Sequence, residues 1–364
     1  MDITQLLTFL FQQNGSDLHI SAGECPMIRV DGDIKKIKIP PLTSEQTQSM
    51  LYDIMNDGQR KVFEEKSDID FSIELGDTAR FRVNVFRQRK GMGAVFRTIP
   101  TKILSLEQLG MPSILAKLSR LEKGLILVTG PTGSGKSTTL AAMIDLINSE
   151  LEGHILTIED PIEFVHPCKK CLVNQREVGP HTHNFSMALR AALREDPDII
   201  LVGEMRDLET IQLALTAAET GHLVFGTLHT SSAPKTVDRI IDVFPPQQQA
   251  QVRAMLSESL QAIVTQTLCK KIGGGRVAAL EVLIGTTAVK NLIRENKIHQ
   301  IASVMQTSQG IGMRTMENAL VDLVQKNLIT RETAIEKTGN PNMFTEQLNG
   351  NGGSGAKASM ARPA

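Results

Sequence analysis

The most constraining feature of this 364-residue sequence is the glycine-rich segment GPTGSGKST at residues 130–138. It directly follows an apolar run at 125–129, and it precedes residues 140–147, whose apolar side chains have helical spacing. A strand, a glycine-rich turn and a helix in this order are the context in which the pattern G-x-x-x-x-G-K-[ST] forms a phosphate-binding loop. The segment therefore predicts an α/β domain with a site for a nucleoside triphosphate.

The residue types in this segment suit a phosphate ligand. Gly133 and Gly135 let the backbone curl so that successive N–H groups point inward, and the helix that follows favours an anion at its N-terminus. Lys136 is predicted to bind the β- and γ-phosphates, and the hydroxyl of Ser137 is predicted to ligate Mg²⁺. The other members of the predicted nucleotide-binding segment are Gly130, Pro131, Thr132, Ser134 and Thr138.

The base of the nucleotide is predicted to be adenine. A GTPase would carry the base-reading pattern Asn/Thr-Lys-x-Asp, and this pattern does not occur in the sequence. The segment that comes nearest to it, Asn-Lys-Ile-His at 296–299, lacks the acid that would read the base. ATP together with Mg²⁺ is therefore the expected ligand.

Length and composition indicate an ordinary globular protein of about two domains. Hydrophobic residues make up 41% of the chain and charged residues 22%. The net charge of −1 does not suggest wholesale phosphate neutralisation along a nucleic acid, although it leaves room for a local basic patch. No apolar run is long enough to cross a bilayer, and the first residues lack the basic region of a signal peptide. We therefore expect a cytoplasmic protein with neither a transmembrane segment nor a nucleic-acid partner.

The pattern along the chain divides it into four parts. Residues 1–98 read as a small α+β domain, and 99–112 as a linker that contains proline and glycine. Residues 113–345 alternate apolar strands with helices, which predicts a mostly parallel sheet covered on both faces and a helical subdomain after it. The glycine- and serine-rich tail at 346–364 cannot bury apolar surface and is expected to be disordered.

Two long segments are predicted to be continuous helices because their apolar residues recur at helical spacing. These segments are 44–66 in the N-terminal domain and 247–268 after the parallel strands. The strands expected in the larger domain are 125–129, 155–158, 199–202 and 223–228.

A basic run at 80–90 is predicted to form a strand of the N-terminal domain. Alternation along a strand would put Arg80 and Arg82 on one face and apolar side chains such as Phe81 on the other. Three interpretations of the arginine face remain open. It is a solvated sheet surface, a surface aimed at a nucleotide held by the other domain or by a neighbouring subunit, or, third, a surface that binds nucleic acid.

Acidic residues follow two of the strands predicted for the larger domain. Glu204 ends the run IILVGE, and an acid at the end of a strand downstream of a phosphate-binding loop is the Walker B arrangement, which holds Mg²⁺ or its waters. Glu159, Asp160 and Glu163 follow another strand. One of these three carboxylates is expected to orient or deprotonate the attacking water, and the residues alone do not choose among them.

Two histidines, His222 and His229, lie at the ends of the strand predicted at 223–228. The edge of the sheet in a nucleotide-binding domain is where ligands bind, so both are predicted to belong to the site. Cys168 and Cys171 have the spacing of metal ligands, but a structural zinc site needs four ligands and no second C-x-x-C occurs. Reduced thiols are therefore favoured over a metal site.

These blocks, in this order and spacing, resemble the secretion ATPase superfamily, whose type II secretion and type IV pilus members carry a Walker A loop, an acidic box, a Walker B block and a histidine box. The resemblance covers nearly the whole chain and is closest to the type IV pilus retraction ATPases. Val289, Lys290 and Arg314 depart from the residues common in those proteins. The segments that carry the resemblance are 15–19, 26–32, 94–100, 130–138, 155–166, 194–207, 217–230 and 288–295.

By this resemblance the chain is expected to join a PAS-like N-terminal domain to a RecA-like ATPase domain. It is further expected to form a homohexameric ring that couples ATP hydrolysis to pilus retraction and twitching motility. Partners implied by the family are an inner-membrane platform protein with the pilus machinery and a paralogous retraction ATPase, at the cytoplasmic face of the inner membrane. The implied site residues are Glu163 as catalytic base, Glu204 as Walker B acid and Mg²⁺ ligand, His222 and His229 as the histidine box, and Arg82 and Arg97 as arginines that reach a nucleotide.

Two other functions are compatible with the same core. The first is a pilus-extension or type II secretion ATPase, but those proteins usually carry a longer N-terminal region and a four-cysteine zinc insert that this sequence lacks. The second is a nucleic-acid translocase, which the near-neutral charge and the scarcity of aromatic residues disfavour. Retraction is therefore the expected function.

Overall fold

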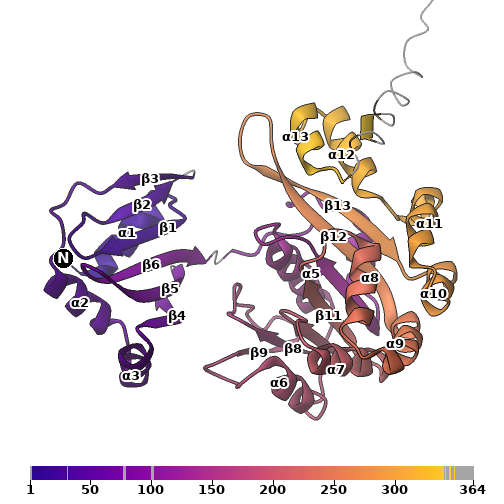
Figure 1. The fold of residues 1–364 in the computed structure, drawn as a ribbon, viewed down its shortest axis with the longest axis horizontal. Helices are drawn as coiled ribbons and strands as arrows, with labels where there is room; N and C mark the ends of the chain where they lie inside the picture. Colours follow the sequence, from indigo (N-terminus) through magenta and orange to yellow (C-terminus); the bar gives the residue numbers. More distant parts are fainter. Residues whose placement is uncertain are drawn as a thin grey trace, which may run out of the picture. The chain divides into compact units, whose positions relative to one another are not determined.

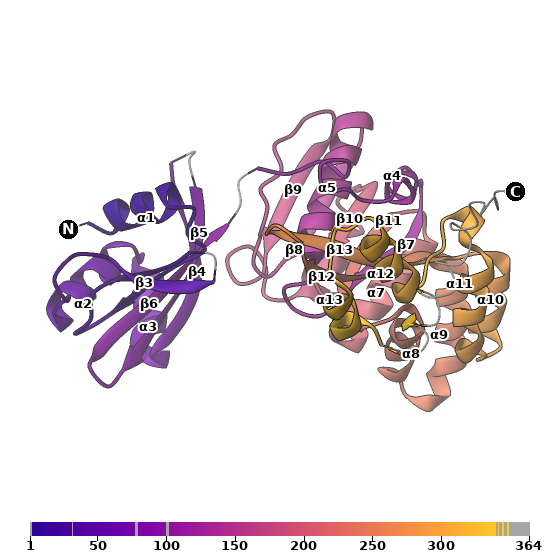
Figure 2. The same cartoon turned by 90° about the horizontal axis from the view of Figure 1, so that it is seen from above.

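In the computed structural model, the chain divides into two compact units, Met1–Lys102 and Ile103–Ala364. The structure describes residues 2–30, 32–76, 79–99, 102–339, 341, 344–345 and 348. Each unit has a β-sheet and helices of its own, which Figures 1 and 2 show coloured along the chain. The tail that was expected to be disordered, 346–364, lies outside the described residues except for Leu348.

The described part of the N-terminal unit contains an antiparallel sheet in the order β3-β2-β1-β6-β5-β4. The alternation predicted for 80–90 is present, because Phe81, Val83 and Val85 are fully buried against the helices while Arg82 lies on the opposite face. The strands are β1 (Asp17–Ser21), β2 (Met27–Val30), β3 (Asp33–Lys36), β4 (Asp68–Leu75), β5 (Ala79–Gln88) and β6 (Gly91–Ile99). The helices are α1 (Ile3–Gln12), α2 (Ser44–Asp53) and α3 (Asp57–Lys66).

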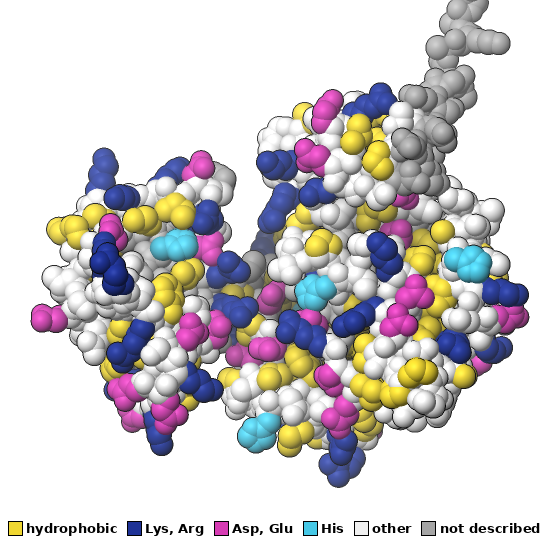
Figure 3. All heavy atoms as spheres, viewed as in Figure 1, with side chains coloured by type: hydrophobic (Ala, Val, Ile, Leu, Met, Phe, Trp, Pro, Cys, Tyr) yellow, Lys and Arg dark blue, Asp and Glu magenta, His cyan; other side chains and the backbone are white. Residues whose placement is uncertain are grey.

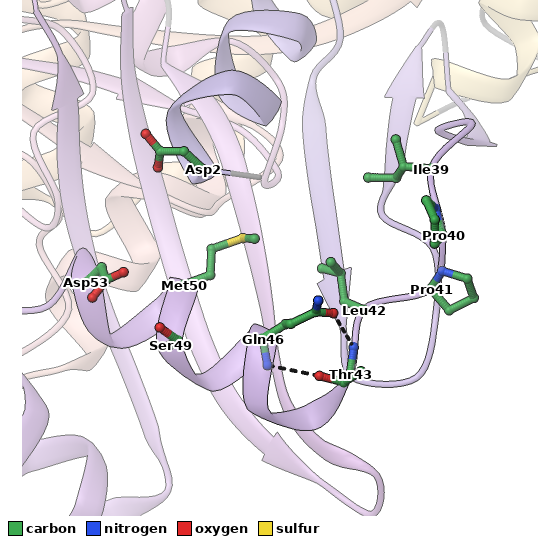
Figure 4. A pocket seen from close by; sticks show the side chains of 10 residues that line it. All are labelled: Asp2, Ile39, Pro40, Pro41, Leu42, Thr43, Gln46, Ser49, Met50 and Asp53. Atoms are coloured by element: carbon green, nitrogen blue, oxygen red, sulfur yellow. Dashed lines mark hydrogen bonds between the residues drawn. The ribbon is translucent and has the colours of Figure 1, made fainter.

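The segment predicted as one helix over 44–66 is two helices, so that prediction was wrong. Thr43 begins α2: its Oγ1 accepts from the Gln46 N–H at 3.1 Å, and its own N–H donates to Gln46 Oε1 at 2.9 Å. Figure 4 shows this pair at the edge of a hollow lined partly by α2. Asn56 caps α3 in the same way, and such reciprocal caps satisfy the first N–H groups of a new helix.

The described part of the second unit contains a sheet in the order β13-β12-β7-β11-β10-β8-β9, parallel except for the β12–β13 pair. The prediction of an α/β fold with a mostly parallel sheet is therefore confirmed. Its strands are β7 (Gly124–Thr129), β8 (His154–Glu159), β9 (Leu172–Glu177), β10 (Ile199–Val202), β11 (Leu223–Leu228), β12 (Leu260–Lys270) and β13 (Arg276–Ile284).

Helices cover both faces of this sheet, as the two views in Figures 1 and 2 show. On β7, Leu125 and Leu127 belong to a core with α6–α11, whereas Ile126 and Val128 belong to a core with α4 and α5. A strand buried on both faces reads as a continuous apolar run, which explains why β7 was visible in the sequence. The helices are α4 (Ser113–Ser119), α5 (Lys136–Glu150), α6 (Phe185–Ala192), α7 (Leu208–Glu219), α8 (Ala233–Asp242), α9 (Pro246–Ser259), α10 (Thr287–Arg294), α11 (Ile301–Thr307), α12 (Met316–Gln325) and α13 (Arg331–Lys337).

The helix predicted over 247–268 is only half correct. Helix α9 ends at Ser259, and β12 follows at once and forms an antiparallel hairpin with β13. Residues of α12 and α13, among them Leu320 and Ala334, pack on this hairpin through Cys269 and Ala279. The helical subdomain expected after the parallel strands is thus attached to the sheet by a hairpin that the sequence pattern did not reveal.

The surface of the molecule shows no segregation of charge on the face in Figure 3, where basic and acidic side chains are interspersed. This mixture agrees with a net charge of −1. Among the helices of the described residues, none combines the length and the apolar character needed to span a membrane.

Candidate nucleotide-binding site

The glycine-rich segment connects the end of β7 to the first turn of α5, as the sequence predicted. Gly130 has φ +138° and Gly135, which caps α5, has φ +87°, and side chains rarely tolerate either conformation. Lys136 is the first residue of α5, and its Nζ donates to the C=O groups of Gly130 at 2.9 Å and Pro131 at 3.2 Å. The ammonium group is therefore held at the loop, where helix N–H groups and a cation together attract a phosphate.

Two of the predicted carboxylates act on this lysine. Burial lowers the pKa of Lys136, and the charges of Glu204 and Glu163 oppose that shift. The structure therefore brings the phosphate-loop lysine, the Walker B acid and one acid of the 159–163 group into one electrostatic site. This arrangement places negative charge where a metal cation and a water molecule would have to be held.

Glu204 follows β10 by two residues, at the same sheet edge as the phosphate-binding loop, because β10, β11 and β7 run parallel. Its carboxylate pairs with Arg206, and its Oε1 lies 3.0 Å from Nε2 of His229. The side chain of Glu204 is 19% exposed, so these contacts leave it within reach of solvent. Glu204 and His229, which the sequence analysis named separately, thus form one cluster.

The structure separates the three acids after β8. Glu159 accepts hydrogen bonds from Thr157 Oγ1 at 2.6 Å and Gln175 Nε2 at 3.1 Å, and burial raises its pKa even though these bonds oppose the shift. Glu163, by contrast, is exposed, while its backbone is hydrogen-bonded to the Glu159 carboxylate. An exposed carboxylate that acts on Lys136 is better placed to meet a water molecule than one committed to internal bonds.

Strand β9, which the sequence analysis missed, holds the loop that carries Glu163. Besides its bond to Glu159, Gln175 Nε2 donates to the Phe164 C=O at 2.8 Å, and its Oε1 accepts from the His166 N–H at 2.8 Å. Most of β9 is polar and lies at the sheet edge, so no apolar run marked it.

His222 lies away from this cluster. It precedes β11, and its C=O accepts from the N–H of Gly124 at the start of β7, whereas the phosphate-binding loop follows the end of β7. A six-residue strand separates these edges by about 20 Å. The structure therefore does not bring His222 to the loop of its own subunit, because the two ends of a parallel strand lie on opposite edges of the sheet. The Nδ1 of His222 instead donates to the C=O of Ala217 at 2.9 Å.

Arg82 and Arg97 belong to the N-terminal unit, where they pair directly across β5 and β6 on the same sheet face. Arg82 Nε lies 3.6 Å from Asp70, and Arg97 Nε lies 3.0 Å from Asp17. Burial alone would raise the pKa of Asp17, but its hydrogen bonds from Ser16 and Arg97 outweigh burial and lower it. The two predicted arginines are thus neighbours with adjacent acidic partners.

A cavity of about 980 Å³ opens beside the phosphate-binding loop, within the second unit. Gly135, Thr138 and Thr139 line it from the loop and α5, and Gln266 and Leu268 line it from β12. No site residue was predicted on β12, because residues 260–268 were predicted to be helical. A cavity next to a phosphate site is the natural place for the rest of a nucleotide.

The residues at the loop offer ligands that suit magnesium. Ser137 lies half-buried in the first turn of α5 and presents a hydroxyl, and Glu204 presents a carboxylate. Hydroxyl and carboxylate oxygens are the donors that Mg²⁺ prefers, so this pair fits the ion. Cys168 and Cys171 are free thiols, and among the described residues no group of three histidines, cysteines or acids is arranged to hold a metal.

Comparisons with known proteins show the family of this chain. A family model described as Type II/IV secretion system protein matches residues 1–332. The chain belongs to this family. Among its relatives in the family is the type IV pilus retraction ATPase PilT of Pseudomonas aeruginosa, which is 64% identical over 94% of this chain and 100% of the relative. A twitching motility protein of Neisseria gonorrhoeae is 60% identical over 86% of this chain and 84% of its own.

A solved structure of the same family is similar throughout. It is a crystal structure of the pilus retraction motor PilT with bound ADP, which superposes with a TM-score of 0.89 and shares 51% sequence identity. The match covers 94% of this chain and 98% of the crystallised chain. The fold class predicted from the sequence, an N-terminal α+β unit followed by a RecA-like core, is therefore that of this secretion-system family.

Proposed function

We propose that this chain is an ATPase motor that drives the disassembly of type IV pili and thereby retraction and twitching motility. The observation that carries this proposal is the 64% identity to a pilus retraction ATPase over that protein's whole length. The site supports it, because Lys136, Glu163 and Glu204 form one electrostatic cluster at the phosphate-binding loop. A chain that only bound nucleotide would not need Glu163 as a base beside the acid that holds Mg²⁺.

The residues divide the work of hydrolysis among them. The loop N–H groups and Lys136 bind the phosphates, and Ser137 and Glu204 would hold Mg²⁺, which neutralises charge on the phosphate oxygens. Glu163 accepts a proton from the water that attacks the γ-phosphate, since it is exposed and close enough to Lys136 to influence its charge. His229 orients the Glu204 carboxylate through their 3.0 Å contact.

The cavity beside the loop receives the adenine and ribose in this proposal. Its lining combines apolar side chains such as Leu268 and Leu280 with polar groups, as small-molecule sites usually do. Its volume of about 980 Å³ is ample for a nucleoside.

The proposed working form is a homohexamer docked on the cytoplasmic face of the inner membrane. In such a ring, heterologous contacts can bring Arg82 and Arg97 of one subunit to the nucleotide of the next. The proposed partners are the inner-membrane platform protein with the pilus machinery and a paralogous retraction ATPase. No nucleic acid is required.

The first test concerns catalysis. We expect Lys136→Ala to abolish ADP binding, and Glu163→Gln to bind ATP while hydrolysing it at least about a hundredfold more slowly. Glu152→Gln, which changes an exposed acid between α5 and β8, is the matched control and should turn over normally. Normal hydrolysis by Glu163→Gln would transfer the base role to Glu159 or Asp160.

The second test concerns the direction of work. Cells that lack the gene should carry excess unretracted pili and lose surface movement. Cells without pili would instead indicate an extension motor, and stimulation of the purified ATPase by single-stranded DNA would indicate a translocase. Complementation with the Glu163→Gln gene should fail to restore movement if hydrolysis drives retraction.

A further inference from the structure

One buried glutamine on β12 is bonded to both the phosphate-binding loop and the helix after it. Gln266 is 2% exposed. Its Nε2 donates to the C=O of Ser134 at 2.7 Å, and its Oε1 accepts from Oγ1 of Thr139 at 2.7 Å. Ser134 lies inside the loop and Thr139 in the first turn of α5, so a single amide group connects the loop and the helix to the neighbouring strand.

The backbone of the loop is packed against the same residue. A Cβ atom at Gly130 would lie 2.2 Å from the C=O of Gln266, and one at Gly135 would lie 2.8 Å from its Nε2. The strands beneath are joined as well, because the hydroxyls of Thr129 on β7 and Thr265 on β12 are 2.9 Å apart. The loop is therefore shaped against β12, and its glycines are required partly by the position of Gln266.

The bond to Ser134 fixes the direction of a peptide group. In a trans peptide the C=O and the following N–H point in opposite directions, so holding the Ser134 C=O toward β12 turns the Gly135 N–H away from β12. A peptide turned the other way would direct a carbonyl oxygen into the loop, where it would repel a phosphate. The amide of Gln266 supplies the donor that prevents this rotation.

We propose that Gln266 is a positioning residue that holds the phosphate-binding loop in its anion-binding shape. The inference rests on the proposed nucleotide site and adds to it a residue that acts through Ser134 and Thr139. An apolar side chain of the same size would leave the Ser134 C=O and the Thr139 hydroxyl buried without partners, because both residues are at most 3% exposed.

The test uses the full chain and two probes, ADP and inorganic pyrophosphate, with affinities measured by calorimetry. We expect Gln266→Leu to lower the affinity for both probes by the same factor, about tenfold to a hundredfold, because the loop binds the phosphates that the two probes share. Gln261→Leu changes the same strand at the end far from the loop. Its affinities for ADP and pyrophosphate should stay within about twofold of those of the unaltered chain. If ADP binding weakened and pyrophosphate binding did not, Gln266 would be a contact of the base and the inference would be wrong.

Two milder variants cover the case in which Gln266→Leu does not fold. Thr139→Val removes one hydroxyl at constant size, and Gln266→Glu keeps the acceptor for Thr139 but loses the donor to Ser134. We expect Gln266→Glu to weaken pyrophosphate binding more than Thr139→Val does, and a cooperative melting transition without ligand will show that each variant is folded. Pyrophosphate affinities equal to that of the unaltered chain in both would overturn the inference.

The outcome for the unaltered chain separates this inference from the proposed function. If the unaltered chain bound neither ADP nor pyrophosphate, the nucleotide site itself would be wrong. If it bound both and all Gln266 variants bound equally well, only the positioning role would be lost.

Discussion

The carboxylate of Glu204 and the imidazole of His229 lie 3.0 Å apart, between Oε1 and Nε2. Glu204 follows β10 and His229 follows β11, and these neighbouring parallel strands end at the edge that carries the phosphate-binding loop. Arg206 pairs with the same carboxylate oxygen, Oε1. A histidine and an arginine therefore orient the acid that is proposed to hold Mg²⁺.

Removing the imidazole should reduce turnover more than binding. We expect His229→Ala to lower the turnover number about tenfold or more, because a hydrogen bond to a charged group contributes about 1.5–3 kcal/mol. ADP affinity, measured by calorimetry, should change less than about threefold, since the loop and Lys136 remain. His299→Ala, an exposed histidine of the second unit, is the control. A turnover number equal to that of the unaltered chain would remove His229 from the site.

Arg82 and Arg97 stand directly opposite each other on antiparallel strands, an arrangement that like charges disfavour. Asp70 and Asp17 offset this repulsion in part, yet the Arg97 side chain remains 68% exposed. Two adjacent exposed cations on a sheet face suit an anionic ligand better than a purely structural surface does. The two arginines therefore favour the interpretation in which the arginine face meets a nucleotide of a neighbouring subunit.

Arg82→Ala should therefore affect the assembled protein and not the isolated chain. We expect its ATPase rate to fall at least about tenfold at concentrations where the ring forms, because an arginine supplied in trans stabilises the charge of the transition state. At concentrations where the chain is monomeric, its rate should match that of the unaltered chain. Arg89→Ala, just beyond β5 and exposed, is the control. An unchanged rate in the ring would return Arg82 to the solvated-face interpretation.

The central part of the fold was predictable because its signals are local. The strands β7, β8, β10 and β11 are buried throughout or in all but their end residues, and the Walker motifs adjoin β7 and β10 in sequence. Strand β12 was mistaken for helix because Leu260, Val264 and Leu268 also fit a helical spacing. Its β-branched run Ile263, Val264, Thr265 was the contrary signal.

The parts of the site that escaped prediction act across long sequence separations. Gln266 bonds Ser134, 132 positions away, and Gln175 reaches Glu159 from a strand with no apolar pattern. No motif or spacing in the sequence connects such pairs, because only the order of strands in the sheet makes them neighbours. At His222 the sequence led to a wrong prediction instead of a missed one. Its position next to a strand did not reveal that it lies at the edge of the sheet away from the phosphate-binding loop.

Glu281 on β13 is a buried carboxyl that the proposed hydrolysis does not use. It accepts the N–H of Ala233, at the start of α8, at 2.6 Å, and the N–H of Met316 at the start of α12. Burial raises the pKa of Glu281 to about 7, and the charge of Glu317 adds to the shift. One side chain thus links two helix N-termini to the β12–β13 hairpin.

This carboxyl should make stability depend on pH near neutrality. The folded chain holds the proton up to about pH 7, whereas the unfolded chain releases it near 4.5, so the stabilisation is complete below 4.5 and is lost as pH rises through about 7. We expect Glu281→Gln to flatten this decline in the free energy of unfolding by up to about 3 kcal/mol, as measured by urea unfolding from pH 5 to 8.5. Glu336→Gln changes an exposed acid on α13 and should show the same decline of stability with pH as the unaltered chain. Parallel curves for all three chains would contradict the assignment.

The cavity beside the loop can be tested by filling it. Leu268→Trp adds an indole to the β12 wall, so we expect ADP affinity to fall about tenfold or more. Pyrophosphate affinity should fall much less, although Leu268 lies beside Gly135 of the loop. This pattern differs from the equal losses expected for Gln266→Leu, because the base and the phosphates are proposed to occupy different parts of the site. Ile272→Trp, exposed and outside the cavity, is the control. Unchanged ADP affinity in Leu268→Trp would place the adenine elsewhere.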